Sequence, residues 1–461
     1  MGEIKDRLEN HFSFKAVEIR LSELLRRVGG LSAQLRERPE AARITSYMNV
    51  GNEVRSSLRR GDALALLALN KIAQSRSDPR IPESRTAYIL RSLKHPDEVR
   101  TLRQVYGDGF FLLAIDASRS IRRKYLTERM NILAEEADQL INRDEAEGEE
   151  FGQQTRDAFE LADAFVSFQR PYFATDLWRI LDLLFGDPFI TPTADEYAMF
   201  HAYAAGLRSG ALSRQVGAVV ALSSGEIVAA GANDVPKFGG GLYWQGEDDE
   251  RDYQWGYDSN AQRRDEMVTE ILAVIESVSQ DCNHDELRRK LQETSLWSIT
   301  EYGRAVHAEM EAMLSCARTG VSTRGASLFS TTFPCHNCAK HIVAAGIVRV
   351  VYVEPYPKSL ALSLHKDAIT LAGNEDQNVT GSPQERQKVR FEPFVGVGPR
   401  MFLDLFSLRL GSGYQLMRKK DVQKISWDRH DATLRLPLPP TSYLERERLV
   451  ISGLDQFLEE R

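Results

Sequence analysis

The sequence predicts an α/β protein of two or three domains, and three observations carry the prediction. Short apolar runs alternate with charged stretches through the first 180 residues or so, which is typical of strands alternating with helices. Two apolar runs near residue 220, joined by Ser223-Ser224-Gly225, predict a hairpin. The length of 461 residues fits two or three domains, and 42% hydrophobic with 27% charged residues excludes a disordered or fibrous chain.

The net charge and the number of cysteines disfavour several classes of protein. The chain has 59 basic and 66 acidic side chains, a net charge of −7, which disfavours a general nucleic-acid binder and leaves small anionic ligands compatible. Four cysteines in so long a chain do not indicate a disulfide framework. The sequence does not begin with a signal peptide, and its apolar runs 63–69 and 109–115 are too short for a membrane span. We therefore expect a cytoplasmic protein without a membrane partner.

The first domain, residues 1–186, is predicted to be a helix-rich α/β layer with parallel strands. Strands are expected at 87–90 and 109–115, and 16–21 fits a strand or the start of a helix. The region 119–142 is predicted to be helical and contains a basic run. That run fits a solvated face better than a contact with phosphates or RNA, and comprises Arg119, Arg122, Arg123, Lys124 and Arg129. The sequence has no G-x-x-x-x-G-K-[ST], so no P-loop can be placed in it.

A domain boundary is predicted at Phe185-Gly186-Asp187-Pro188, where an apolar helix gives way to a Gly/Pro turn. The second domain, residues 187–400, is expected to begin with a helix at 195–209, followed by the hairpin 216–232. Residues 401–461 end in an amphipathic helix at 443–458 and are expected to pack on this second domain.

Between the hairpin and residue 300 lies a long segment that contains Gly239-Gly240-Gly241 and an aromatic stretch at 243–257. A compact domain rarely keeps so long a connection without using it, so we expect a role in binding or gating. A helix is expected at 260–279. Further strands are expected at 326–333, 349–354 and 389–395.

Two short motifs carry the chemistry. His307-Ala308-Glu309 is followed, after 24 intervening residues, by Pro334-Cys335-His336-Asn337-Cys338. The cysteines, three apart at the start of a helix, project from one face, where the helix dipole favours thiolate. With His307, they supply three ligands to one zinc ion and leave the fourth tetrahedral position for water, as in catalytic zinc sites.

Glu309 is better suited to moving protons than to binding metal. H-x-E with P-C-x-x-C is the signature of zinc-dependent nucleobase deaminases. We expect Glu309 to take a proton from the acidified water and deliver it to N3 of a cytosine while hydroxide attacks C4. Loss of ammonia then leaves uracil.

Some residues in and near these motifs also fit structural roles. A zinc knuckle that only joins two helices would explain C-x-x-C, but not H-x-E at this distance. Cys316 is expected in the core. Cys282 beside His284 fits a surface turn better than a second metal site. His336 and His341 are expected to be structural.

These motifs resemble the cytidine and deoxycytidylate deaminase family, and the likeness extends to three further segments. Residues 208–218 resemble its R-S-x(4)-R-x-V-G-A entry to the first strand, 231–236 its G-x-N-x-x-P loop, and 334–342 its P-C-x-x-C-A-K-x-I. The resemblance implies that Asn233 contacts the sugar or phosphate of a nucleotide. The alternative is an asparagine that serves only the local turn.

A narrower resemblance, to the bacterial anti-phage dCTP deaminases, rests on segments 91–99 and 239–244. It implies a cytidine-deaminase-like α/β/α domain with a mixed sheet, preceded by a nucleotide-kinase-like domain. The Gly-rich phosphate loop expected before residues 5–25 is absent here. The family's activity, conversion of dCTP or dCMP to the uracil nucleotide, depletes dCTP during phage infection. Symmetric homo-oligomers are implied, and an inhibitory RNA or protein is a candidate partner.

Phosphates of such a substrate need local cations. The candidates are Arg208, Arg214, Lys237 and Lys358. Tyr243 and Trp244 would stack on the base or form a small core of their loop, and Ala308 is included among the substrate contacts. Two other functions stay open: a nucleic-acid editing deaminase that holds RNA near Arg122, and a non-catalytic nucleotide sensor with structural zinc.

Overall fold

The computed structural model describes residues 2–145, 147, 149, 151–168, 172–278, 283–356, 358–372, 388–436, 442–452 and 454. The chain divides into two compact units. Unit 1 comprises Met1–Pro192 together with Val395–Arg461, and unit 2 comprises Thr193–Phe394. Within the described residues, no helix combines the length and apolarity needed to cross a membrane.

Unit 1 contains two small sheets. β1 (Lys15–Arg20) pairs in parallel with β2 (Thr86–Arg91), and β3 (Leu113–Asp116) pairs in parallel with β4 (Ala164–Ser167). The short β11 (Gly396–Val397) adds antiparallel to β4. The predicted parallel pairing is therefore confirmed, and residues 16–21 lie mostly in a strand. The strand predicted at 109–115 begins only at Leu113, because Gly107–Gly109 form a 3-10 turn.

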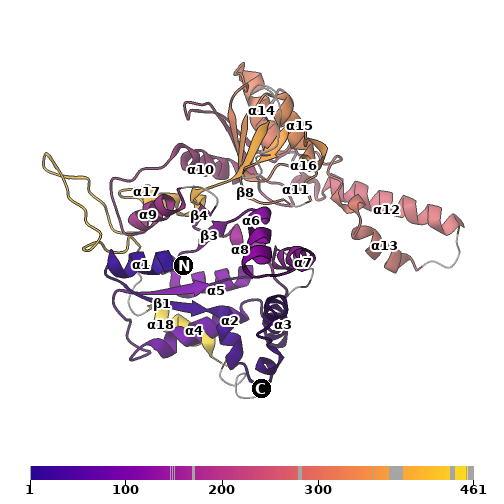
Figure 1. Cartoon of the computed structure of the whole chain (residues 1–461). Coiled ribbons are helices and arrows are strands. Elements are labelled where there is room, and N and C mark those ends of the chain that lie inside the picture. The colour runs from indigo at the N-terminus through magenta and orange to yellow at the C-terminus, as the bar shows by residue number, and fades with distance from the viewer. Residues whose placement is uncertain are drawn as a thin grey trace. The chain divides into compact units, whose positions relative to one another are not determined.

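Helices surround these sheets (Figure 1). They are α1 (Gly2–Asn10), α2 (Leu21–Leu24), α3 (Glu40–Leu58), α4 (Ala63–Ser75), α5 (Pro96–Tyr106), α6 (Arg119–Lys124), α7 (Ala134–Glu145), α8 (Thr155–Phe159), α9 (Phe173–Leu184), α17 (Phe402–Phe406) and α18 (Ser442–Ile451). The core of unit 1 gathers around α4, which is buried from Ala63 to Leu69. A short hairpin joins β12 (Lys419–Lys420) to β13 (Gln423–Lys424).

The helix predicted at 119–142 is interrupted. α6 passes into a π-helical turn, and α7 begins only at Ala134, because Asn131 has a left-handed backbone (φ 56°) that no α-helix contains. The basic run lies against acidic side chains of α7: Arg119 and Arg123 pair with Asp138, and Arg122 pairs with Glu145. These ion pairs fit the solvated charged face that was predicted for the basic run in preference to a contact with phosphates or RNA.

The prediction that residues 401–461 pack on the second domain is wrong. They belong to unit 1, where α18 packs against α4 and α5. Nη2 of Arg76 lies 2.6 Å from Oε1 of Glu447, and Tyr106 donates its hydroxyl to the same oxygen. An amphipathic pattern shows that a helix has an apolar face but not which surface covers it. Unit 2 accordingly spans 193–394, in place of the predicted 187–400.

Unit 2 is built on one mixed sheet with the strand order β6-β5-β7-β8-β10-β9. β5 is antiparallel to both of its neighbours, and the pairs from β7 to β9 are parallel. The strands are β5 (Gly217–Ala221), β6 (Ile227–Ala232), β7 (Ser327–Thr332), β8 (Arg349–Glu354), β9 (Ile369–Leu371) and β10 (Val389–Pro393). The predicted hairpin and the three later strands are confirmed.

Helices cover both faces of this sheet. α10 (Ala194–Gly206) packs on one face, while α14 (Ala308–Thr319) and α15 (His336–Ala344) pack on the other. Gly231 in β6 allows α14 to pack closely on the sheet, because a Cβ there would collide with backbone atoms of Ala308 and Ala312. Gly217 in β5 allows the same close packing against α10, because a Cβ there would collide with backbone atoms of Ala202 and Gly206. The close approach sets the N-terminus of α14 over the sheet, directly after His307.

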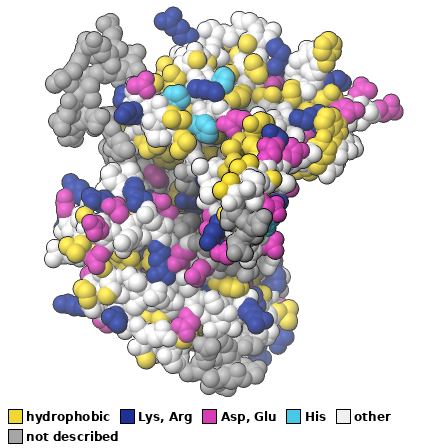
Figure 2. Space-filling model, turned by 90° about the vertical axis from the view of Figure 1, so that its right-hand side faces the viewer, with side chains coloured by type: hydrophobic (Ala, Val, Ile, Leu, Met, Phe, Trp, Pro, Cys, Tyr) yellow, Lys and Arg dark blue, Asp and Glu magenta, His cyan; other side chains and the backbone are white. Residues whose placement is uncertain are grey.

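The long segment after the hairpin is more regular than expected. It contains α11 (Asp252–Trp255), α12 (Ser259–Val278) and α13 (His284–Gln292), and the last two pack on each other and extend away from the sheet (Figure 1). The short α16 (Ala361–Leu364) follows β8. Cys282 and residues 373–387 lie outside the described residues. On the face drawn in Figure 2, acidic and basic side chains are interspersed.

Candidate metal and catalytic site

Three metal-binding side chains meet where α14 and α15 begin. His307 immediately precedes α14, Cys335 immediately precedes α15, and Cys338 lies in the first turn of α15. Nδ1 of His307 lies 3.3 Å from Sγ of each cysteine, and the two sulfurs are 3.7 Å apart. The structure therefore brings together the three residues that the sequence predicted as ligands.

The donor set fits one zinc ion. Zinc–sulfur bonds of roughly 2.3 Å in a tetrahedron place two thiolates roughly 3.8 Å apart. The observed sulfur separation of 3.7 Å agrees with this value. The three ligand atoms lie within 4.8 Å of one another. One nitrogen and two sulfur donors also match the ligand types that zinc prefers.

Electrostatics at the three ligands favours a thiolate. The hydrogen bond that the two sulfurs share lowers the pKa of Cys335 to about 4, and hydrogen bonding to Cys335 raises the pKa of His307. The same shared bond, together with burial, raises the pKa of Cys338 well above its usual value. One sulfur thus carries the negative charge while the other keeps a proton, which a bound cation would release.

The carboxylate of Glu309 lies beside these ligands and is 4% exposed. Its Oε2 lies 3.4 Å from Sγ of Cys338, and its Oε1 accepts a hydrogen bond of 3.4 Å from the hydroxyl of Ser330 on β7. Burial raises the pKa of this carboxyl group. A carboxyl group so placed can both accept and return a proton. Sequence reasoning missed Ser330, because it is one of four hydroxyl residues in β7 (Ser327–Thr332) and nothing local distinguishes it from the others.

Arg214 lies at the edge of the site. Its Nη1 is 2.7 Å from Oε1 of Glu354, and its guanidinium lies 5.2 Å from the ring centre of Tyr356. Its positive charge is also near enough to His307 to oppose the rise in the pKa of that imidazole. Neither Glu354 nor Tyr356 was singled out from the sequence, because nothing in their local pattern links them to the metal-binding motifs.

Asn233 uses its side chain to hold the loop that carries Arg214. The amide Nδ2 donates to the carbonyl of Arg214 at 2.7 Å, and Oδ1 accepts from the backbone N–H of Val216 at 2.6 Å. This is the local turn role that was the alternative for Asn233. Its predicted contact with a nucleotide stays a prediction.

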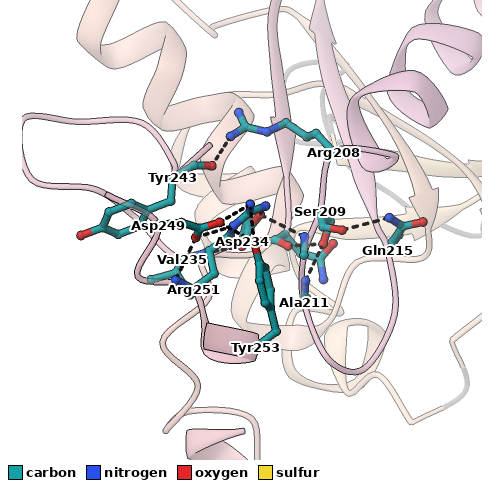
Figure 3. A network of polar contacts seen from close by, with 12 residues as sticks. Arg208, Ser209, Ala211, Gln215, Asp234, Val235, Tyr243, Asp249, Arg251 and Tyr253 are labelled. Carbon is teal, nitrogen blue, oxygen red and sulfur yellow. Dashed lines mark hydrogen bonds and ion pairs between the residues drawn. The ribbon is translucent and has the colours of Figure 1, made fainter. Parts of the chain in front are cut away.

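Tyr243, Trp244 and Lys237 form a second cluster. Arg208 donates to the carbonyl of Tyr243 at 2.6 Å (Figure 3), and its guanidinium stacks 3.6 Å from the ring centre of Trp244. Lys237 lies 5.7 Å from the ring centre of Tyr243 and 3.6 Å from a carboxylate oxygen of Asp248. Arg208 and Tyr243 connect these residues to one another, and their predicted contacts with a substrate stay predictions.

The remaining predicted residues have simple surroundings. Ala308 is fully buried against Gly231, and Cys316 lies in the core as predicted. Lys358 is exposed. His341 donates Nδ1–H to the carbonyl of Asn337, and His336 lies 3.5 Å from Glu301, so both make the structural contacts that were expected.

Comparison with known proteins places this site in a family. Residues 192–354 match the family model described as the cytidine and deoxycytidylate deaminase zinc-binding region. Over 53 residues the chain is 49% identical to ComE operon protein 2 of Bacillus subtilis, covering 12% of this chain and 28% of that protein. Over 107 residues it is 33% identical to the probable deoxycytidylate deaminase of Drosophila melanogaster, covering 23% and 51%. The chain thus spans about three tenths and about half of these relatives.

Two further similarities concern phage proteins. The deoxycytidylate deaminase of Enterobacteria phage T4 is 46% identical over 54 residues, which cover 12% of this chain and 28% of that protein. The solved dCMP deaminase of cyanophage S-TIM5, in complex with dCMP and dUMP, is 20% identical, covering 44% of this chain and 99% of that one with a TM-score of 0.25. The match to the zinc-binding region of cytidine and deoxycytidylate deaminases is confined to residues 192–354.

Proposed function

We propose that the protein is a zinc-dependent enzyme that hydrolytically deaminates deoxycytidine nucleotides, dCMP or dCTP, to the corresponding uracil nucleotides. The observation that carries the proposal is the buried carboxylate of Glu309, 3.4 Å from Sγ of Cys338. A closed structural zinc site has four protein ligands and no use for an acid at that distance. The site has the three-ligand arrangement and the neighbouring acid that hydrolysis requires.

His307, Cys335 and Cys338 would hold one zinc ion. When bound, zinc lowers the pKa of a water molecule toward neutrality and makes it a nucleophile. Glu309 acts as the proton carrier, because burial raises its pKa and lets the carboxyl group accept and release protons in turn. It would carry one proton from the attacking water to the base, and a second proton from the added hydroxyl group to the departing amine. Ser330 holds one oxygen of this carboxylate and so fixes which oxygen faces the substrate.

Substrate recognition in this proposal falls to the loops around the site. Arg214 meets a phosphate, supported by its exposed guanidinium at the edge of the metal-binding group. Asn233 shapes the same loop. Contacts from Lys237, Tyr243, Trp244 and Ala308 are part of the proposal and rest on the resemblance of their segments to the deaminase family.

The proposal extends to the biological role. Depletion of dCTP in anti-phage defence, and a nucleotide-kinase-like character of unit 1, are supported by the likeness of segments 91–99 and 239–244 to anti-phage dCTP deaminases. Homo-oligomers are proposed by analogy with the cytidine-deaminase family, and an inhibitory RNA or protein is a candidate partner. The cytoplasm is the proposed compartment.

An assay of ammonia release tests the activity. The full chain, loaded with zinc, is given dCMP, dCTP, cytidine and a single-stranded oligonucleotide. We expect turnover of dCMP, dCTP or both, and loss of turnover when a chelator removes the metal. Turnover of the oligonucleotide alone would replace the proposal with nucleic-acid editing. Binding of nucleotide and zinc with no ammonia released would indicate the non-catalytic sensor.

A further inference from the structure

A buried arginine, Arg251, contacts several segments of unit 2 (Figure 3). The side chain of Arg251 is 7% exposed, and those of Asp249 and Asp234 are each 1% exposed. Nε and Nη2 of Arg251 donate to the two oxygens of Asp249 at 2.8 and 2.6 Å, a two-pronged pair. Nη1 lies 3.4 Å from Oδ2 of Asp234. One guanidinium thus pairs with two buried carboxylates, and removing it would leave both without this cation.

Asp234 passes this restraint to the backbone. Its Oδ2 accepts from the N–H of Gly210 at 3.1 Å, and its Oδ1 accepts from the N–H of Val235 at 2.9 Å. Gly210 also packs closely against Arg251 and Tyr253. A Cβ at this position would lie 3.0 Å from Nη1 of Arg251 and 2.9 Å from the ring of Tyr253. Gly210 is therefore held by its hydrogen bond to the carboxylate of Asp234 and by packing against Arg251 and Tyr253.

Hydrogen bonds also connect the neighbour of Gly210 to Arg214. Ser209, next to Gly210, donates its hydroxyl to the carbonyl of Asn233 at 2.6 Å, and Asn233 holds the carbonyl of Arg214 at 2.7 Å. The loop 209–216 is thus attached at both ends to residues 233 and 234. Because Asp234 contacts both Gly210 and Arg251, it connects the guanidinium to that loop.

We propose that Arg251 is a positioning residue for phosphate recognition, which sets loop 209–216 so that Arg214 meets the phosphate of the substrate. This inference rests on the proposed deamination of nucleotides. The conservative change to lysine keeps the charge but loses the planar two-pronged bond to Asp249, so the loop shifts while the buried charges stay compensated. The defect should appear in binding of the phosphate and not in the chemistry at Glu309.

The test compares a substrate with and without phosphate. The full-length, zinc-loaded protein and Arg251→Lys are assayed on dCMP and on deoxycytidine. We expect Arg251→Lys to raise KM for dCMP by about tenfold, with kcat for dCMP and kcat/KM for deoxycytidine changed by less than about threefold. Arg263→Lys, an exposed arginine on α12 paired with Glu266 and Glu270, is the matched control and should behave as the parent protein.

Two further variants keep the test decisive. If Arg251→Lys fails to fold, Tyr253→Phe removes only a hydroxyl that binds both Arg251 and Asp249, and should raise KM for dCMP by about threefold. Arg214→Met combined with Arg251→Lys should be no worse on dCMP than Arg214→Met alone, because both changes remove one interaction.

Each other outcome overturns the inference. Equal losses on dCMP and deoxycytidine would show a purely structural role for Arg251, as would additive effects of the two changes. An unchanged KM for dCMP in a folded Arg251→Lys or Tyr253→Phe protein would show no role at all. Failure of the proposed function is a separate result, since the parent protein would then deaminate neither substrate.

Discussion

Sγ of Cys338 and Oε2 of Glu309 lie 3.4 Å apart, so the acid stands beside a metal ligand without being one of the three predicted ligands. Changing Glu309 to Gln removes the proton carrier and keeps the shape. We expect kcat to fall by about 10²- to 10⁴-fold. Zinc content, measured by atomic emission, should stay at one ion per chain. Glu286→Gln on the exposed face of α13 is the control, and full activity of Glu309→Gln would exclude the mechanism.

The contact between Gly231 and α14 leads to a second prediction. Gly231→Ala places a methyl group into the backbone of Ala308 and Ala312, so the helix must move away from the sheet. We expect a loss of about 1–3 kcal/mol in the free energy of unfolding of unit 2. Weaker zinc binding, measured by competition with a chelator, should accompany it. Gly246→Ala has no atom within 4 Å of the new Cβ and should change neither quantity.

The assignment of the C-terminal segment to unit 1 can be checked through the buried pair Arg76–Glu447, whose side chains are 1% and 3% exposed. Glu447→Ala leaves a buried guanidinium without its partner and should cost about 3–5 kcal/mol in denaturant unfolding of unit 1. Glu445→Ala breaks an exposed pair with Arg448 on the same helix and should cost less than about 1 kcal/mol. Equal effects of the two changes would contradict the packing of α18.

Acid stability should depend on Asp249. Hydrogen bonding to Arg251 lowers the pKa of this carboxyl group in the folded protein. A lowered pKa stabilises the fold above the unfolded pKa of about 4, and this stabilisation disappears as the pH falls below it. The difference in free energy of unfolding between the parent protein and Asp249→Asn should therefore be largest near neutrality and shrink on acidification. Asp248→Asn, which changes a side chain 88% exposed, should give no such trend.

The metal-binding residues were predictable because their chemistry is local. His307 and Cys335 each precede a helix, and Cys338 follows three residues later, so spacing along the chain places the donors on helix ends. The strands and the hairpin of unit 2 were predictable for the same reason, since alternation and turn residues lie within a few positions of one another.

The features that were missed depend on distant parts of the chain. Arg76 and Glu447 are separated by 371 positions, and no local pattern announces their pairing. Ser330 reaches Glu309 only because β7 packs under α14. Arg251 resembles any other charged residue of its polar loop until the fold buries it with Asp234 and Asp249. Burial, and not sequence position, gives these residues their roles.

Unit 1 is made from two stretches of chain, one that precedes unit 2 in the sequence and one that follows it. During synthesis, which proceeds from the N-terminus, the deaminase-like unit is complete once residue 394 has left the ribosome, while unit 1 still waits for α18 and the partner of Arg76. The nascent polypeptide therefore carries an unfinished N-terminal half for the whole time that its second unit is being made. Nascent chains stalled before residue 442 should expose the apolar surface of α4 that α18 later covers.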